Sequence, residues 1–83
     1  MERIKELAED FLTKHDGNIY SRDGFAALYV CIFQSNVGVE SIWYAKDEDK
    51  VYLHCGCMEF EGDIDIESLS DENQKHIMDY LKA

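Results

Sequence analysis

The sequence predicts one α+β domain over residues 1–83, in the order helix, three or four antiparallel strands, helix, with both helices packed on one face of the sheet. Apolar residues recur at helical spacing near both ends of the chain, whereas the middle is rich in β-branched and aromatic residues separated by turn signals. The chain of 83 residues has no proline and no low-complexity linker. A second domain is therefore not expected.

The first expected helix covers residues 2–15. Apolar side chains recur there every three or four residues, and charged side chains fill the other positions, which is typical of an amphipathic helix. We expect it to stop at Asp16-Gly17-Asn18, because Gly17 can adopt the left-handed conformation that ends many helices. Its apolar positions are Ile4, Leu7, Ala8, Phe11 and Leu12.

A turn region from Ile19 to Gly24 precedes a nearly continuous apolar run from Phe25 to Gln34. We interpret this run as a central strand from Tyr29 onward, buried on both faces, because its second half is β-branched and aromatic. A short helix through residues 26–28, capped by Asp23, is the alternative, since periodicity alone does not separate the two.

Residues 39–46 and 50–58 are the next two expected strands. A turn at Ser35-Asn36 with Gly38 precedes the first strand, and the polar loop Asp47-Glu48-Asp49 joins the two as antiparallel neighbours. In the second strand the alternation assigns Val51, Leu53, Cys55 and Cys57 to one face, and Tyr52, His54 and Met58 to the other.

The most regular pattern in the chain is the alternation of acids with apolar residues and Gly62 from Glu59 to Glu67. Such alternation is typical of a strand with one wet and one dry face, so five carboxylates would share a face, successive ones about 6.7 Å apart. Neighbours at that distance repel by about 0.6 kcal/mol in water, and folding alone does not require this. We call this row the acid ladder: Glu59, Glu61, Asp63, Asp65 and Glu67.

The apolar positions change from odd to even numbers near Gly56, which indicates a bulge or a tight bend there. The acid ladder is then either a continuation of the third strand or a short fourth strand. Ser70 is the expected N-cap of the last helix. Its inner face should consist of Asn73, Ile77, Tyr80 and Leu81, and the core should include Leu7, Phe11, Val30, Ile32, Leu53 and Ile77.

Eighteen acids against eight bases give a formal charge of −10, which repels nucleic acid and anionic membranes and favours basic protein partners. The charged N-terminus and the lack of a long apolar run predict a cytoplasmic protein with no membrane contact. Three cysteines are an odd number, and Cys55 and Cys57 are spaced poorly for a disulfide, so reduced thiols are expected.

The acid ladder can imitate a phosphate backbone, because one strand of duplex DNA carries a charge about every 3.4 Å of its axis. No Lys or Arg occurs from Val51 to Gln74, which favours a partner-binding role over solubility alone. The alternative is a solvated strand face whose charges prevent pairing with another sheet edge. The predicted partner-binding residues are Glu59, Glu61, Asp63, Asp65 and Glu67, with Asp47, Glu48 and Asp49 from the polar loop.

Other kinds of site have weaker patterns. Asp63, Asp65 and Glu67 lack the loop spacing of a calcium site, and His54 would face away from Cys55 in a regular strand. No Cys–His spacing brings a nucleophile and a base together. We expect no catalytic residue, metal or cofactor. Trp43, Tyr44 and Tyr52 are expected to pack across strands, since no basic groove accompanies them.

In size, charge and element order the chain is similar in general character to small acidic inhibitors carried by phages and mobile elements, such as anti-CRISPR proteins, and to nuclease immunity proteins. The likeness is one of type and involves no shared motif. It implies a non-enzymatic binding protein, an inhibitor or nucleic-acid mimic that blocks a basic nucleic-acid-handling partner. The alternatives are a small metal-binding protein and a homo-oligomeric module, for example a homodimer.

Overall fold

The computed structural model describes residues 3–15, 19–21, 29–32, 35–56 and 61–82, with only the backbone described for 29–32 and 35–37. All strand pairs are antiparallel, and the predicted α+β class is confirmed. The elements are α1 (Ile4–Lys14), β1 (Ile19–Tyr20), β2 (Tyr29–Ile32), β3 (Ser35–Ala45), β4 (Lys50–Gly56), β5 (Glu61–Asp65), the 3₁₀ helix η2 (Ile66–Ser68) and α2 (Asp71–Lys82).

β3 is the central strand of the sheet. It pairs with β4 along one edge, and with β2 and β1 along the other, β2 near its start and β1 near its end. β5 pairs with the far edge of β4. The prediction of a central strand from Tyr29 onward is therefore wrong in its placement, because β2 pairs with β3 alone among the described strands. Residues 22–28, where the short helix was the alternative, lie outside the described part of the chain.

Parts of two predicted turns are strands in the structure, while residues 22–24 of the first turn lie outside the described part of the chain. Ile19 and Tyr20 pair with Trp43 and Ile42, where a branched and an aromatic side chain suit a sheet edge. β3 begins at Ser35, so Ser35-Asn36 extends the strand that pairs with β2. The polar loop is confirmed as a turn, with Asp49 at a φ of 53°, a left-handed conformation that Asp tolerates better than most residues.

The acid-rich segment forms a separate strand. β5 runs antiparallel to β4, with Leu53 opposite Ile64 and Gly56 opposite Glu61. Odd-numbered residues of β4 thus face even-numbered residues of β5 on the same side of the sheet. The change from odd to even apolar positions marks the reversal of chain direction between Gly56 and Glu61. Of the two alternatives, a separate short strand is the right one.

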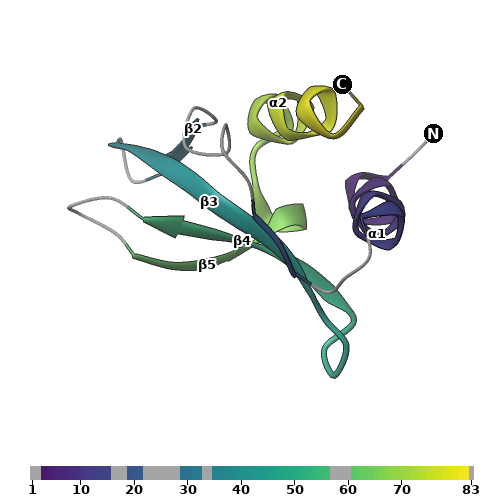
Figure 1. Ribbon diagram of the computed structural model, residues 1–83. Coiled ribbons are helices and arrows are strands. Elements are labelled where there is room, and N and C mark those ends of the chain that lie inside the picture. Colours follow the sequence, from purple (N-terminus) through teal and green to yellow (C-terminus); the bar gives the residue numbers. More distant parts are fainter. Residues whose placement is uncertain (1–2, 16–18, 22–28, 33–34, 57–60, 83) are drawn as a thin grey trace.

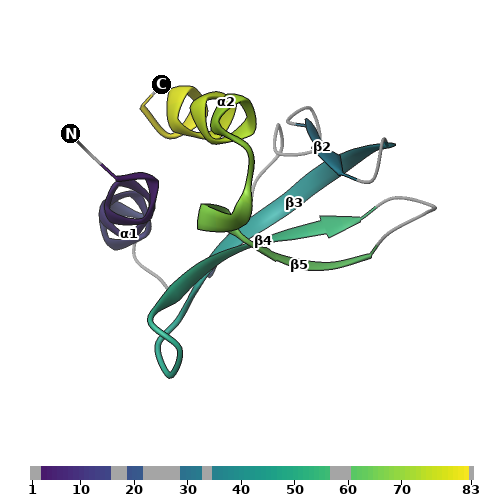
Figure 2. The ribbon, with the colours of Figure 1, turned by 180° about the vertical axis from the view of Figure 1, so that it is seen from behind.

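Both helices cover the same face of the sheet, as was predicted (Figures 1 and 2). The core lies between them and the inner sides of β3 and β4, where Leu53 and Ile77 are buried, while Leu7 and Phe11 pack partly buried against it. The predicted core residues Val30 and Ile32 have no described side chains. No described helix covers the other side of the sheet, which we call the open face (Figures 1 and 2).

The helix ends follow local chemistry. The Ser70 hydroxyl accepts a hydrogen bond from the Asn73 N–H at 3.2 Å, which confirms Ser70 as the N-cap of α2. α1 ends at Lys14, and the expected Gly17 cap lies outside the described residues. The inner face of α2 is confirmed, with Asn73, Ile77 and Leu81 buried and Tyr80 packed partly buried against the core.

Leu53→Ala should lower the free energy of unfolding by about 2–5 kcal/mol, because the side chain is 1% exposed and its loss leaves a cavity. Ile19→Ala is the matched control, since Ile19 is 67% exposed, and it should change stability by less than about 0.5 kcal/mol. Urea unfolding followed by circular dichroism measures both. Equal losses for the two variants would contradict the assignment of the faces.

Candidate functional site

The open face is organised in rows that run across the strands, because residues paired in neighbouring antiparallel strands point to the same side. Each row ends at an acid of β5. Along the sheet, the first row is Ile19, Trp43, Tyr52 and Asp65, the second is Ser41, His54 and Asp63, and the third is Gly38, Gly56 and Glu61.

Two stacked aromatic rings lie at the centre of this face. The rings of Trp43 and Tyr52 are 5.2 Å apart at an interplanar angle of 24°, which confirms their expected packing across strands. The Trp43 Nε1–H donates to Asp63 Oδ1 at 2.9 Å, and the Tyr52 hydroxyl donates to Glu48 Oε1 at 2.9 Å. Each ring is therefore held in place by a carboxylate at its polar edge.

Tyr52 lies in a negative electrostatic environment. Its hydrogen bond to Glu48 raises the pKa of the phenol, as do its partial burial and the charges of Glu48, Asp65 and Asp63. The phenol therefore remains a protonated donor at neutral pH. The same shift indicates that three carboxylates from the turn and from β5 act on one ring.

A bulge brings a further acid to this face. Val39 pairs with Cys55 and Ser41 with His54, so Glu40 is the extra residue in β3. Glu40 Oε2 lies 3.5 Å from His54 Nε2, and Asp63 Oδ1 lies 3.2 Å from His54 Nδ1. His54 thus lies between two carboxylates.

Gly56 leaves room for the carboxylate of Glu40. A Cβ atom at position 56 would lie 3.0 Å from Glu40 Oε1, a tighter contact than nearly all Cβ atoms make in folded proteins, so the end of the Glu40 side chain would have to move. The glycine next to the reversal between β4 and β5 therefore also allows the acid of the bulge to lie against the sheet.

The structure keeps only part of the acid ladder on one face. Glu61, Asp63 and Asp65 take alternate positions of β5 and point to the open face, whereas Glu59 lies outside the described residues. The placement of Glu67 in the same row is wrong, because Glu67 belongs to η2 and its Oε2 lies 2.5 Å from Arg3 Nη2. Asp65 Oδ1 accepts from the Glu67 N–H at 2.9 Å, and this cap turns the chain out of the strand.

The three acids of the β3–β4 turn have different surroundings and do not form one surface. Glu48 holds Tyr52 at the open face, and Asp47 is exposed. Asp49 instead accepts from the Tyr44 hydroxyl at 2.6 Å and pairs with Lys5 Nζ at 3.1 Å. Asp49 therefore ties the turn to α1, and its predicted role in partner binding competes with this structural one.

Metal ligands do not gather in the described part of the chain. Cys55 is buried on the core side and His54 lies on the open face, as the strand alternation predicted, and Cys57 lies outside the described residues. No group of three possible ligands is found among the residues that the structure describes.

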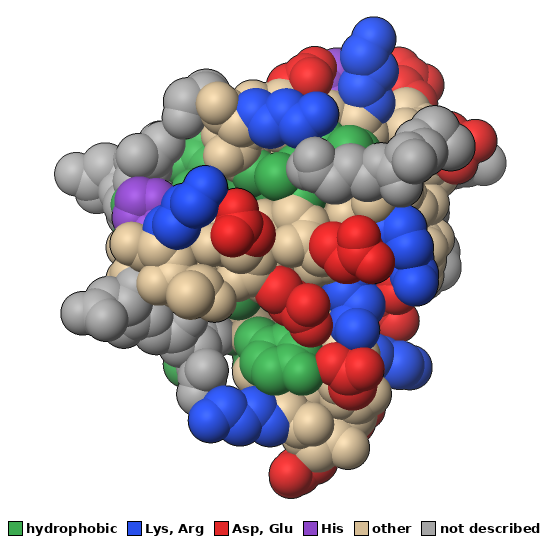
Figure 3. Space-filling model, turned by 90° about the vertical axis from the view of Figure 1, so that its right-hand side faces the viewer, with side chains coloured by type: hydrophobic (Ala, Val, Ile, Leu, Met, Phe, Trp, Pro, Cys, Tyr) green, Lys and Arg blue, Asp and Glu red, His purple; other side chains and the backbone are tan. Residues whose placement is uncertain are grey.

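Charge is distributed unevenly over the molecule. The side that carries α1 shows Lys and Arg side chains interspersed with Asp and Glu (Figure 3). Two ion pairs lie within α1, Lys14–Asp10 at 3.0 Å and Lys5–Glu9 at 3.6 Å. Among the described strand residues of the open face, His54 and Lys50 are the basic side chains. The acids there outnumber the bases, although Lys46 lies nearby in the turn.

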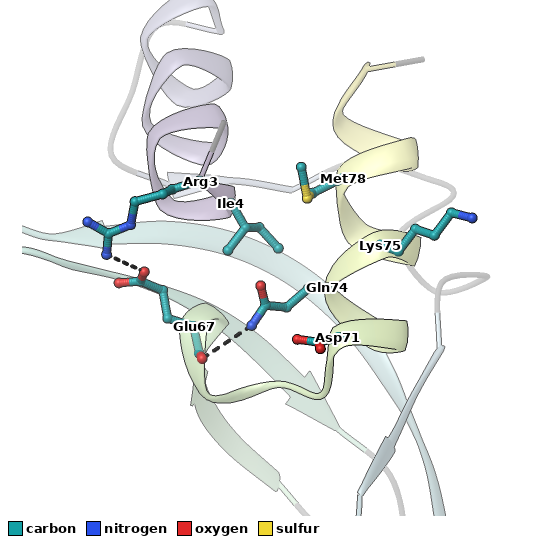
Figure 4. Close-up of a pocket in the computed structure, with 7 residues that line it drawn as sticks. All are labelled: Arg3, Ile4, Glu67, Asp71, Gln74, Lys75 and Met78. Carbon is teal, nitrogen blue, oxygen red and sulfur yellow. Dashed lines mark hydrogen bonds and ion pairs between the residues drawn. The ribbon is translucent and has the colours of Figure 1, made fainter. Parts of the chain in front are cut away.

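A hollow of about 400 Å³ lies between α1, η2 and α2 (Figure 4). Three of its polar side chains have partners within the protein: Arg3 pairs with Glu67, and the Gln74 amide donates to the carbonyl oxygens of Glu67 at 3.3 Å and Leu69 at 3.0 Å. The remainder is lined by Ile4, Met78, Asp71 and Lys75. These contacts join the N-terminus of α1, η2 and α2, so we regard the hollow as part of the packing between these elements and not as a binding site.

Comparisons of the chain with protein-family models, curated proteins and solved structures found no match. Neither α1 nor α2, the two described helices longer than one turn, has the length and apolar composition that crossing a bilayer requires. The case for a site therefore depends on the geometry of the open face. The position of Glu40 beside His54 was not predicted from the sequence. The pairing of Trp43 with Tyr52 could be predicted, because the polar loop lies midway between them.

Asp49→Asn should lower the melting temperature at neutral pH, because the hydrogen bond from Tyr44 and the charge of Lys5 hold the pKa of Asp49 below its ordinary 3.8. A depressed carboxyl pKa stabilises the fold above 3.8 and loses this effect as the pH falls through the lower folded value. Melting curves from pH 7 into acid should therefore converge for the two proteins. Asn tolerates the left-handed backbone at this position, so a difference that persists unchanged in acid would contradict the account.

Proposed function

We propose that this protein is a non-enzymatic binding protein whose open face blocks the basic surface of a nucleic-acid-handling protein. The observation that carries the proposal is the alternate placement of Glu61, Asp63 and Asp65 on one strand, with Glu40 and Glu48 beside them. Basic side chains are few on the same face and mixed with acids on the side of α1 (Figure 3).

The spacing of these carboxylates suits a surface that binds phosphate. Alternate residues of a strand lie about 6.7 Å apart, close to twice the axial distance of about 3.4 Å between phosphates of one DNA strand. A row held by a sheet loses little conformational entropy on binding, compared with acids on a flexible chain. A basic groove would therefore meet an ordered array of negative charge.

The contacts within the face leave most of this charge available. Asp63 accepts from the indole of Trp43, which is a neutral donor. Lys50 Nζ lies 3.7 Å from Asp65 Oδ2, and its side chain is 49% exposed, so this ion pair is screened by water. Glu61 is exposed and has no ion pair with another described residue. A negative field therefore remains to steer a basic partner.

Immobilised protein should retain basic proteins from a lysate of the cells that make it at about 0.05 M salt and release them at about 0.5 M. Excess duplex DNA should also release them, because both ligands would occupy one groove. Replacing Glu61, Asp63 and Asp65 by Gln, Asn and Asn should abolish this DNA-sensitive retention. The readout is the identity and amount of retained protein by mass spectrometry.

The matched control removes the same charge from the helices, through Glu6→Gln, Asp10→Asn and Asp79→Asn together. It should retain the partner nearly as well as the unmodified protein, because these acids lie on α1 and α2. Equal losses in the two triple variants would mean that net charge alone drives retention. Retention of the same proteins by the Glu61, Asp63 and Asp65 variant would show that β5 is not the binding surface.

A further inference from the structure

The open face presents an aromatic surface inside its acidic border. Ile19, Trp43 and Tyr52 form one row across β1, β3 and β4, and Ile19 is 67% exposed. Asp63 holds the indole edge of this row and Glu48 holds the phenol. An aromatic centre with a polar rim is the usual form of the energetically important part of a protein interface.

A hollow of about 460 Å³ opens beside this row at the β3–β4 turn. The residues that line it run from Trp43 to Glu48, so aromatic rings, the carboxylates of Asp47 and Glu48 and the side chain of Lys46 border the same recess. The recess is shallow, so a side chain of a partner can lie in it beside the aromatic row.

The carboxylates that fix the rings each have a second oxygen. Asp63 Oδ1 receives the Trp43 indole and faces His54, and Glu48 Oε1 receives Tyr52. The other oxygens, Asp63 Oδ2 and Glu48 Oε2, have no hydrogen bond or ion pair to the described residues. They can accept hydrogen bonds from a donor that lies against the rings.

A guanidinium group fits this combination better than an ammonium group. It is planar, it stacks on aromatic faces, and it donates in a fixed fork to carboxylates while lying flat. A lysine ammonium is a strongly hydrated point charge that gains less from a ring. The carboxylates of Glu48, Asp65 and Asp63, which help raise the pKa of Tyr52, supply the negative field in which such a cation would lie.

We propose that the open face takes an arginine side chain of its basic partner, stacked on the Trp43–Tyr52 pair and hydrogen-bonded to the carboxylates of Glu48 and Asp63. This inference rests on the proposed function and specifies the chemistry of the partner. A second copy of the chain fits less well, because a self-paired open face would bring Glu48, Asp63 and Asp65 against the same acids of a molecule with a charge of −10.

The test uses two labelled peptides of equal length and charge, one of alternating arginine and glycine and one of alternating lysine and glycine. By fluorescence anisotropy, the protein should bind the arginine peptide about three- to fivefold more tightly, the ratio expected of an exposed cation–π contact. Trp43 is the single tryptophan of the chain, so its emission should change on addition of the arginine peptide.

Trp43→Leu should bind the two peptides equally, while Trp43→Phe, which keeps a ring, should keep most of the preference. Circular dichroism checks that both variants fold. Equal binding of the two peptides by the unmodified protein, or a preference that survives in Trp43→Leu, would overturn the inference. A dimer seen by light scattering and lost in Trp43→Leu would also overturn it, since a second copy would then occupy the face.

The outcomes separate this inference from the proposed function. If arginine and lysine peptides bind equally but the Glu61, Asp63 and Asp65 variant binds both more weakly, the arginine site is wrong and the acidic surface stands. If that variant binds both peptides as tightly as the unmodified protein, the acidic surface itself is wrong.

Discussion

The register between β3 and β4 is the constraint on which the rest of the structure depends. The turn after Ala45 sets Ala45 opposite Lys50, and this places Trp43 opposite Tyr52 and Ile42 opposite Leu53. A slip of one residue would send Leu53 to water and Tyr52 into the core. The register therefore determines both the buried face on which the helices pack and the aromatic pair of the open face.

The same register passes to β5 and determines where its charge points. Because Leu53 lies opposite Ile64, the even positions of β5 face the core and the acids at 61, 63 and 65 face outward. At Asp65 the side chain caps the next turn, the strand ends, and Glu67 turns to Arg3. The core thus fixes a short row of carboxylates, of which Asp65 also caps η2.

Much of this was predictable from the sequence. The helical spacing of apolar residues predicted both helices, Ser70 predicted the start of α2, and the polar loop predicted the hairpin of β3 and β4. The position of β2 was not predictable, because an apolar run does not specify how many neighbours a strand has. Glu67 was misplaced because Ile66 remains buried in η2, so the alternation continues although the strand has ended. Glu40 lies near His54 because of a bulge in β3, and no residue type at that position predicts a bulge.

Backbone NMR of labelled protein with the arginine peptide distinguishes binding at the open face from binding on the helix side. Binding at the open face should give shifts confined to β3, β4, β5 and the turn, with the largest at the Trp43 indole N–H, whose hydrogen bond to Asp63 borders the proposed site. Shifts centred on Arg3, Gln74 and Lys75 in the hollow between the helices would show that the peptide binds there and not at the open face.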